Sequence, residues 1–225
     1  MDKRILCQSL FTFDNFFLKK YFSHYLYPYE IVNEIKNIAR SIVNCGIEGY
    51  VLLSPGVLIG QNVKIADTAM IDGPTIIGND CEIRHGAYIR GGVILGRGCI
   101  VGNSSEIKDS LLLDGAKAPH FNYVGNSVLG NGAHLGAGAI CSNLKSDGKD
   151  VVIRGERLEV NTGLRKFGAV LGDGVEIGCG SVLCPGTIIG KNTSVYPLTI
   201  TRGYYPEGSI VKDTYSVVKK EAASE

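Results

Sequence analysis

Arg90 and Lys108 are cationic residues whose spacing could build an anion-binding site. Each directly follows a large aliphatic residue, and eighteen positions separate them. If eighteen residues make one turn of a coil, the two side chains stack on neighbouring strands, which lie about 4.8 Å apart. Two stacked cations repel each other unless an anion lies between them, and phosphate suits an arginine fork beside a lysine. The alternative is a solvated pair with Asp72, one turn below Arg90, as the countercharge.

His120 is the second candidate for chemistry. It follows Pro119 in the segment KAPHFNYVG, close to Tyr123. A neutral imidazole on a rigid wall can act as a general base, although a single histidine can equally be structural. We expect no metal cofactor, because no convincing triad is offered by the four histidines, His24, His85, His120 and His134.

A six-residue repeat must position these side chains. Large aliphatic residues recur at every sixth position, namely Leu53, Ile59, Ile65, Ile71, Ile77, Ile83, Ile89, Leu95, Val101, Ile107 and Leu113. The fourth position after an aliphatic residue is small or β-branched, and glycine often follows the aliphatic residue directly. Neither a helix of period 3.6 nor a flat strand of period 2 produces this pattern. It is typical of a parallel β-helix, in which three hexapeptides form one triangular coil of 18 residues.

The repeat falters at Pro119 and is lost from Asn143 to Lys166. It then returns in register at Leu171, Ile177, Leu183, Ile189 and Val195. The lost stretch is charged and predicts a loop projecting from the β-helix, which could cover a cleft. Because repeats supply rigidity, we expect functional groups near such interruptions.

Residues 14–44 precede the repeat and read as two helices. Phe17, Tyr21 and Tyr25 recur at helical spacing, Pro28 is expected to stop that segment, and apolar residues from Ile31 to Val43 mark a second amphipathic helix. We expect these helices to cap the open end of the β-helix, with a docking surface as the alternative. The predicted organisation is a helical segment over residues 1–50, the β-helix over 51–215 with an inserted loop at 144–166, and a tail over 216–225.

The overall composition excludes several classes of protein. Glycine occurs 30 times and proline only 7 times, hydrophobic residues make up 44% of the chain, and the net charge is +1. Collagen, wholesale disorder and nonspecific nucleic-acid or membrane binding are therefore not expected. The seven cysteines form no CxxC pair, and neither a signal peptide nor a membrane span is evident. We expect free thiols and a cytoplasmic location.

The stretch from about Glu82 to Val195 resembles the acetyltransferase domain of the bifunctional UDP-N-acetylglucosamine pyrophosphorylase/glucosamine-1-phosphate N-acetyltransferases. The matching phrases are YIRGG, VGNSSEIK, KAPHFNYVG and LGAGAICSN, and the later TGLRKFGAVLGDGVEIGCGSVLCPGTIIG is similar to the archaeal and clostridial-type branch. The resemblance implies that the fold is a mainly β, left-handed parallel β-helix with an N-terminal α-helical cap. It covers about 200 residues and leaves out the nucleotidyltransferase domain, which the ~50 residues before the repeat are too few to form.

The resemblance also implies roles for individual residues. His120 corresponds to the catalytic base. The substrate ligands correspond to Arg90, Lys108, Tyr123, His134 and Lys149, and the acetyl-CoA contacts to Ala137, Asn143 and Cys179. Three positions depart from the bacterial pattern: His134 replaces an asparagine, Cys179 replaces a serine, and Lys149 lies in a loop of different length.

The implied function is acetyl-CoA-dependent N-acetylation of glucosamine 1-phosphate or galactosamine 1-phosphate in UDP-N-acetylglucosamine and nucleotide-sugar biosynthesis. The implied assembly is a homotrimer. A non-catalytic partner subunit of a separate nucleotidyltransferase is the main alternative. A zinc-dependent carbonic anhydrase is a further alternative, but it needs three converging histidines. An O-acetyltransferase is another, but the paired cations favour a phosphorylated acceptor and argue against it.

Overall fold

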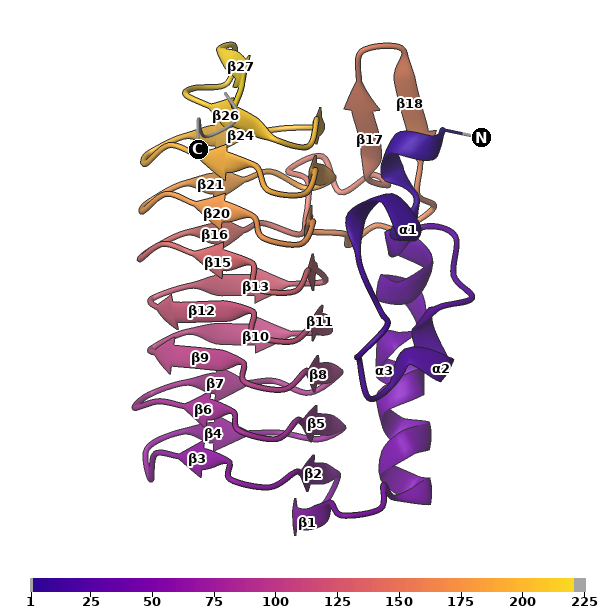
Figure 1. Cartoon of the computed structure of the whole chain (residues 1–225), viewed down its shortest axis with the longest axis vertical. Helices are drawn as coiled ribbons and strands as arrows, with labels where there is room; N and C mark the ends of the chain where they lie inside the picture. The colour runs from indigo at the N-terminus through magenta and orange to yellow at the C-terminus, as the bar shows by residue number, and fades with distance from the viewer. Residues whose placement is uncertain (1, 221–225) are drawn as a thin grey trace, which may run out of the picture.

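The computed structural model describes residues 2–220 as a triangular β-helix with helices along one flank (Figure 1). Two nine-stranded sheets and one seven-stranded sheet form the three sides, which we call sheets A, B and C in the order in which the chain first enters them. Strands of the same sheet are parallel from coil to coil, and only the outermost pairs β1–β2 and β26–β27 are antiparallel. The fold class is the mainly β, left-handed parallel β-helix that the sequence predicts.

The strands are short, as expected for a hexapeptide coil. Sheet A contains β1 (Val51–Ser54), β2 (Val57–Ile59), β5 (Thr75–Ile77), β8 (Val93–Leu95), β11 (Ser110–Leu112), β14 (Val128–Leu129), β19 (Ala169–Leu171), β22 (Thr187–Ile189) and β25 (Tyr204–Tyr205). Sheet B contains β3 (Lys64–Ile65), β6 (Glu82–Ile83), β9 (Ile100–Asn103), β12 (Lys117–His120), β15 (His134–Leu135), β20 (Glu176–Ile177), β23 (Ser194–Val195), β26 (Ser209–Val211) and β27 (Val217–Lys219). Sheet C contains β4 (Met70–Ile71), β7 (Tyr88–Ile89), β10 (Glu106–Lys108), β13 (Tyr123–Gly125), β16 (Ile140–Cys141), β21 (Val182–Leu183) and β24 (Ile200–Thr201).

The aliphatic column from Ile59 to Ile107 lines the interior, and its register then shifts by one residue at each of two successive turns from sheet C to sheet A. Leu95 pairs with Leu112 rather than with the predicted Leu113, and Glu106 pairs with Tyr123. These coils are therefore seventeen residues long instead of eighteen, because the turn from sheet C to sheet A is one residue shorter. Beyond the insertion the ladder continues directly, since Leu129 pairs with Leu171.

The helical segment lies along sheet A and does not cover the open end, so the predicted placement of the cap is wrong (Figure 1). The described segment contains a 3₁₀ turn (Lys3–Ile5), the single turns α1 (Cys7–Leu10) and α2 (Lys19–Phe22), and the long helix α3 (Pro28–Cys45). The physical reason is that sheet A is apolar on both faces, because its strands carry consecutive buried residues such as Ile76–Ile77 and Ile94–Leu95. Outward Ile76 and Ile94 share a buried cluster with Ile31 and Ile35 of α3.

The boundary between the two predicted helices also differs from the expectation. Pro28 begins α3 instead of ending the preceding segment, because a proline at the first helical position sacrifices no intrahelical hydrogen bond. Glu30 supports this start by accepting hydrogen bonds from the backbone N–H groups of Leu26 and Tyr27, each at 2.9 Å. Before it, residues 2–27 contain the 3₁₀ turn and the single turns α1 and α2.

The insertion after Asn143 folds as a hairpin of β17 (Val152–Gly155) and β18 (Leu158–Asn161), not as a structureless loop. An isolated bridge between Leu144 and Lys166 closes its base. Its inward residues, Val151, Ile153 and Leu158, are buried in the same cluster as the N-terminal helices. The hairpin therefore extends the flank of sheet A (Figure 1).

Candidate functional site

His120 lies at the turn between sheets B and C, which we call the B–C corner. Backbone hydrogen bonds stack this corner from coil to coil: Phe121 N–H donates to Asn103 O at 2.8 Å, Gly138 N–H to His120 O at 3.0 Å, and Gly180 N–H to Ala137 O at 2.8 Å. The structure therefore brings three of the predicted site residues, His120, Ala137 and Cys179, onto successive coils of one edge. Their order along the edge follows directly from the coil period.

The exposed groups of the B–C corner suit the handling of a reactive carbonyl. The His120 side chain is exposed, and its ring makes no hydrogen bond to any residue between 2 and 220. In the same part of the chain, the Ala137 N–H has no hydrogen-bond acceptor. A base and an unengaged backbone donor on adjacent coils are the two groups that acyl transfer to an amine requires.

The outer face of sheet C carries the two stacked cations. Ile89 pairs with Ile107, so Arg90 and Lys108 lie on neighbouring strands, as the eighteen-residue spacing predicts. His120 precedes its sheet C strand, β13, whereas Lys108 is the last residue of β10, so the imidazole and the cations lie at opposite edges of a narrow sheet. Tyr123 begins β13 and lies on the strand between these edges.

Both cations have carboxylate partners within the chain. Arg90 Nη1 lies 2.7 Å from Glu106 Oε1, and Lys108 Nζ lies 3.5 Å from Asp109 Oδ2. Asp72 does not serve as the countercharge of Arg90, because it accepts a hydrogen bond from the Tyr88 hydroxyl at 3.0 Å. The charges within these two ion pairs cancel, so an anion that binds here competes with Glu106 and Asp109.

Tyr123 and Asn143 meet above Gly125. A Cβ atom at Gly125 would lie 2.6 Å from the Tyr123 hydroxyl and 2.7 Å from Asn143 Nδ2, so the missing side chain makes room for both groups. Asn143 Nδ2 also donates to Asn126 Oδ1 at 2.6 Å. Burial raises the pKa of the Tyr123 hydroxyl, and the nearby Glu106 carboxylate raises it further. Tyr123 therefore remains a hydrogen-bond donor at neutral pH.

Two of the predicted substrate ligands are not joined to this group. His134 lies on the outer face of sheet B, where its Nδ1 is 2.8 Å from Glu176 Oε2. Lys149 is exposed in the insertion, and its backbone N–H donates to Asp147 Oδ1 at 3.0 Å. No hydrogen bond or ion pair within residues 2–220 connects either side chain to His120, Arg90 or Lys108.

Sequence reasoning missed two contributors to the site. Glu106 precedes Lys108 by two residues in β10, so alternation along a strand places both side chains on the same face. This alternation is sufficient to place Glu106 beside Lys108 from the sequence. Gly125 could not be identified from the sequence, because its close approach to Tyr123 and Asn143 depends on three segments meeting in space.

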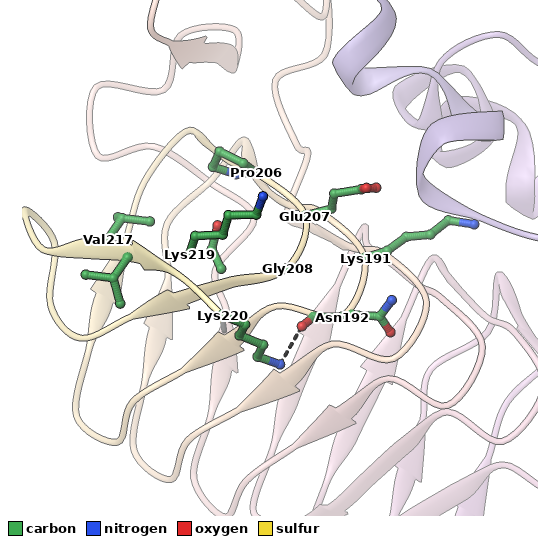
Figure 2. A pocket seen from close by; sticks show the side chains of 10 residues that line it. Lys191, Asn192, Pro206, Glu207, Gly208, Val217, Lys219 and Lys220 are labelled. Carbon is green, nitrogen blue, oxygen red and sulfur yellow. Dashed lines mark hydrogen bonds between the residues drawn. The ribbon is translucent and has the colours of Figure 1, made fainter. Parts of the chain in front are cut away.

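A cavity of about 1030 Å³ lies away from this site, at the C-terminal end of the β-helix (Figure 2). Its walls come from Lys191–Asn192, Pro206–Ser209 and β27. None of the predicted site residues lines this cavity. The candidate site is an open edge and face of the β-helix rather than a closed cavity.

The described residues contain neither a cluster of potential metal ligands nor a membrane-spanning helix. Within residues 2–220 no three His, Cys, Asp or Glu side chains of a single chain are grouped to hold a metal ion. In the same part of the chain, no helix is long and apolar enough to cross a membrane.

Comparison with known proteins points to one group of relatives. A family model described as the GMPPB C-terminal domain matches residues 71–178, slightly under half of the chain. A bifunctional sugar-1-phosphate nucleotidylyltransferase/acetyltransferase of Sulfurisphaera tokodaii is 37% identical over 90 residues, covering 40% of this chain and 22% of that protein. The bifunctional protein GlmU of Pseudoalteromonas atlantica is 32% identical over 163 residues, covering 68% of this chain and 32% of that protein. This chain is related to these bifunctional enzymes.

The relationship covers a part of those proteins only. The chain spans less than a third of the length of these two relatives. Among solved structures, AntD, an N-acyltransferase from Bacillus cereus in complex with a dTDP-amino sugar and coenzyme A, matches with a TM-score of 0.48 and 15% identity, covering 79% of this chain and 92% of that chain. The resemblance noted in the sequence, to the acetyltransferase domain of bifunctional nucleotidyltransferase/acetyltransferases, is confirmed by the sequence relatives.

Proposed function

We propose that this protein is an acetyl-CoA-dependent N-acetyltransferase that acts on a hexosamine 1-phosphate, either glucosamine 1-phosphate or galactosamine 1-phosphate. One observation carries the proposal: the exposed His120 imidazole and the unengaged Ala137 N–H lie on adjacent coils of the B–C corner. The sequence relationship to sugar-1-phosphate nucleotidylyltransferase/acetyltransferases supports the choice of substrate. A reducing, cytoplasmic setting accords with seven free cysteines.

In this proposal His120 accepts a proton from the ammonium of the amino sugar, because an ammonium has no lone pair for attack. The freed amine forms the C–N bond with the thioester carbonyl carbon. Ala137 N–H donates to the carbonyl oxygen as negative charge collects there. The C–S bond then breaks, a second amine proton leaves with the thiol, and the acetamide remains on the sugar.

The sheet C face is the proposed phosphate-binding surface. Tyr123 is a protonated donor beside Arg90 and Lys108, and a phosphate could accept hydrogen bonds from all three. It must displace Glu106 from Arg90, which is feasible because that ion pair is well exposed to water. By pairing with Arg90, Glu106 thus lowers the affinity of the sheet C face for anions that bind arginine less strongly than phosphate does.

We further propose that the chain forms a homotrimer with its sites between subunits. Exposed apolar side chains gather on sheet C and the B–C corner, with exposed fractions of 61% for Phe121, 82% for Leu198 and 54% for Ile200. Apolar patches of this kind mark protein interfaces. A second copy that covers this face would also shield His120 and Ala137 from water.

The test is release of free thiol from acetyl-CoA with a panel of hexosamines and hexosamine 1-phosphates. We expect turnover with a phosphorylated amino sugar and a much higher KM for its unphosphorylated form. Arg90→Ala should raise the KM for the sugar phosphate about tenfold or more, since a charged hydrogen bond contributes roughly 1.5–3 kcal/mol. Arg84→Ala is the matched control, because Arg84 pairs with Glu82 at 2.9 Å on sheet B in the same coil.

One observation favours the alternative of a non-catalytic partner subunit. The pairing of Arg90 with Glu106 and of Lys108 with Asp109 leaves no uncompensated cation on that face. A protein without thiol release on any hexosamine 1-phosphate, and without acetyl-CoA binding by calorimetry, would establish that alternative.

A further inference from the structure

Asn122 occupies an unusual position inside the B–C corner. The backbone ladder makes it equivalent to Ser105 one coil below and to Ala139 and Ser181 on the coils above. Those residues are small, whereas Asn122 carries an amide and is 3% exposed. The preceding inward residue is Ala118, where the paired position of the coil below holds Val101. A smaller inward residue at position 118 thus accompanies the larger residue at position 122.

The Asn122 amide is fully used in hydrogen bonds. Its Nδ2 donates to Gly136 O at 2.8 Å and to Ala139 O at 3.2 Å. Its Oδ1 accepts from the His120 backbone N–H at 3.0 Å. One buried side chain thus ties the backbone of His120 to both ends of the Gly136–Ala139 turn, which contains Ala137.

A second hydrogen bond also connects His120 to the Gly136–Ala139 turn. Gly138 N–H donates to His120 O at 3.0 Å. The carbonyl of His120 is therefore held directly by the Gly136–Ala139 turn, and its N–H is held by Asn122. The spacing between the imidazole and the Ala137 N–H is therefore set by hydrogen bonds inside the corner. Acyl transfer depends steeply on such spacing, since a displacement of about 1 Å can lower a rate about 10²-fold.

We propose that Asn122 is a positioning residue, which holds the proton-accepting imidazole of His120 at a fixed distance from the oxyanion-binding N–H of Ala137. The inference rests on the proposed acetyl transfer. Asn122 touches neither substrate, and its effect passes through His120 and the Gly136–Ala139 turn.

Asn122→Ser is the sharpest variant, because serine already occupies the equivalent position in two other coils, and the fold accommodates it. The hydroxyl is too short to span from His120 N–H to both carbonyl groups. We expect kcat to fall tenfold or more, with the KM values for acetyl-CoA and the sugar phosphate changed less than about twofold. Ser181→Ala is the matched control. It removes hydrogen bonds of the same kind that do not involve His120: Ser181 Oγ donates to Tyr196 O at 3.0 Å and accepts from Thr199 N–H at 3.3 Å.

A double-mutant cycle separates positioning from a general loss of structure. In a His120→Ala background the Asn122→Ser change should lower the residual rate less than twofold, since there is no longer an imidazole to position. The inference is overturned if the decreases in rate caused by Asn122→Ser and by His120→Ala multiply in the double variant. It is also overturned if Asn122→Ser keeps kcat within twofold of wild type, or if Ser181→Ala lowers kcat as much as Asn122→Ser does. A wild-type protein that is inactive on every hexosamine 1-phosphate would instead overturn the proposed function, and this inference with it.

Discussion

At the scale of single residues, His120 is the group on which acetyl transfer depends most directly. The His120→Ala change should lower kcat about 10²–10⁴-fold, the usual contribution of a general base. Because the side chain is exposed, the melting temperature and the binding of acetyl-CoA should remain close to wild type. Thiol release and calorimetry together measure both effects. Unchanged turnover in this variant would remove His120 from the mechanism.

Gly125 tests the role of the sheet C face without removing any polar group. In Gly125→Ala the new methyl group would push aside the Tyr123 hydroxyl and Asn143 Nδ2, which are the ends of adjustable side chains. We expect the KM for the sugar phosphate to rise about tenfold, equivalent to roughly 1.4 kcal/mol of lost binding. The stability to urea should change little. If the KM stays constant while the stability falls, Gly125 serves packing alone.

At the scale of elements, α3 is held on the outer face of sheet A by buried aliphatic side chains. Ile35 is completely buried in this interface, whereas its neighbour Lys36 points to solvent. The Ile35→Ala change should lower the free energy of unfolding by about 2–5 kcal/mol, the usual cost of truncating a core isoleucine. Lys36→Ala should change it by less than about 0.5 kcal/mol. Urea denaturation followed by circular dichroism measures both, and equal effects would contradict the packing described.

At the scale of the whole molecule, the apolar side chains on sheet C and the B–C corner predict self-association. Leu198→Lys places a charge in this patch and should shift the assembly from trimer toward monomer, because burial of an unpaired charge in an interface is strongly unfavourable. Light scattering coupled to gel filtration measures the mass. Leu26→Lys is the control, since Leu26 is also exposed, at 51%, but lies on the N-terminal segment, away from sheet C. A wild-type protein that is monomeric at micromolar concentration would exclude the trimer.

The hexapeptide pattern is sufficient to predict the β-helix and much of the arrangement of the site along it. A six-residue period forces aliphatic residues inward and returns equivalent positions to the same edge, so the stacking of Arg90 on Lys108 was readable from spacing alone. The return of the period at Leu171 also predicted that the coil continues beyond the insertion. Periodicity carries such information because each coil contacts only its neighbours.

The elements that cover the β-helix and the pairing of its charged side chains become visible only in the folded chain. The helices lie on sheet A because outward residues such as Ile76 and Ile94 form an apolar face. The six-residue repeat identifies the inward residues of each strand and does not reveal this outer surface. Strand alternation indicates the face on which Glu106 lies, but its pairing with Arg90, the space above Gly125 and the links through Asn122 depend on side-chain directions on separate coils. Those directions are set by packing and hydrogen bonds between segments distant in sequence, which no local pattern encodes.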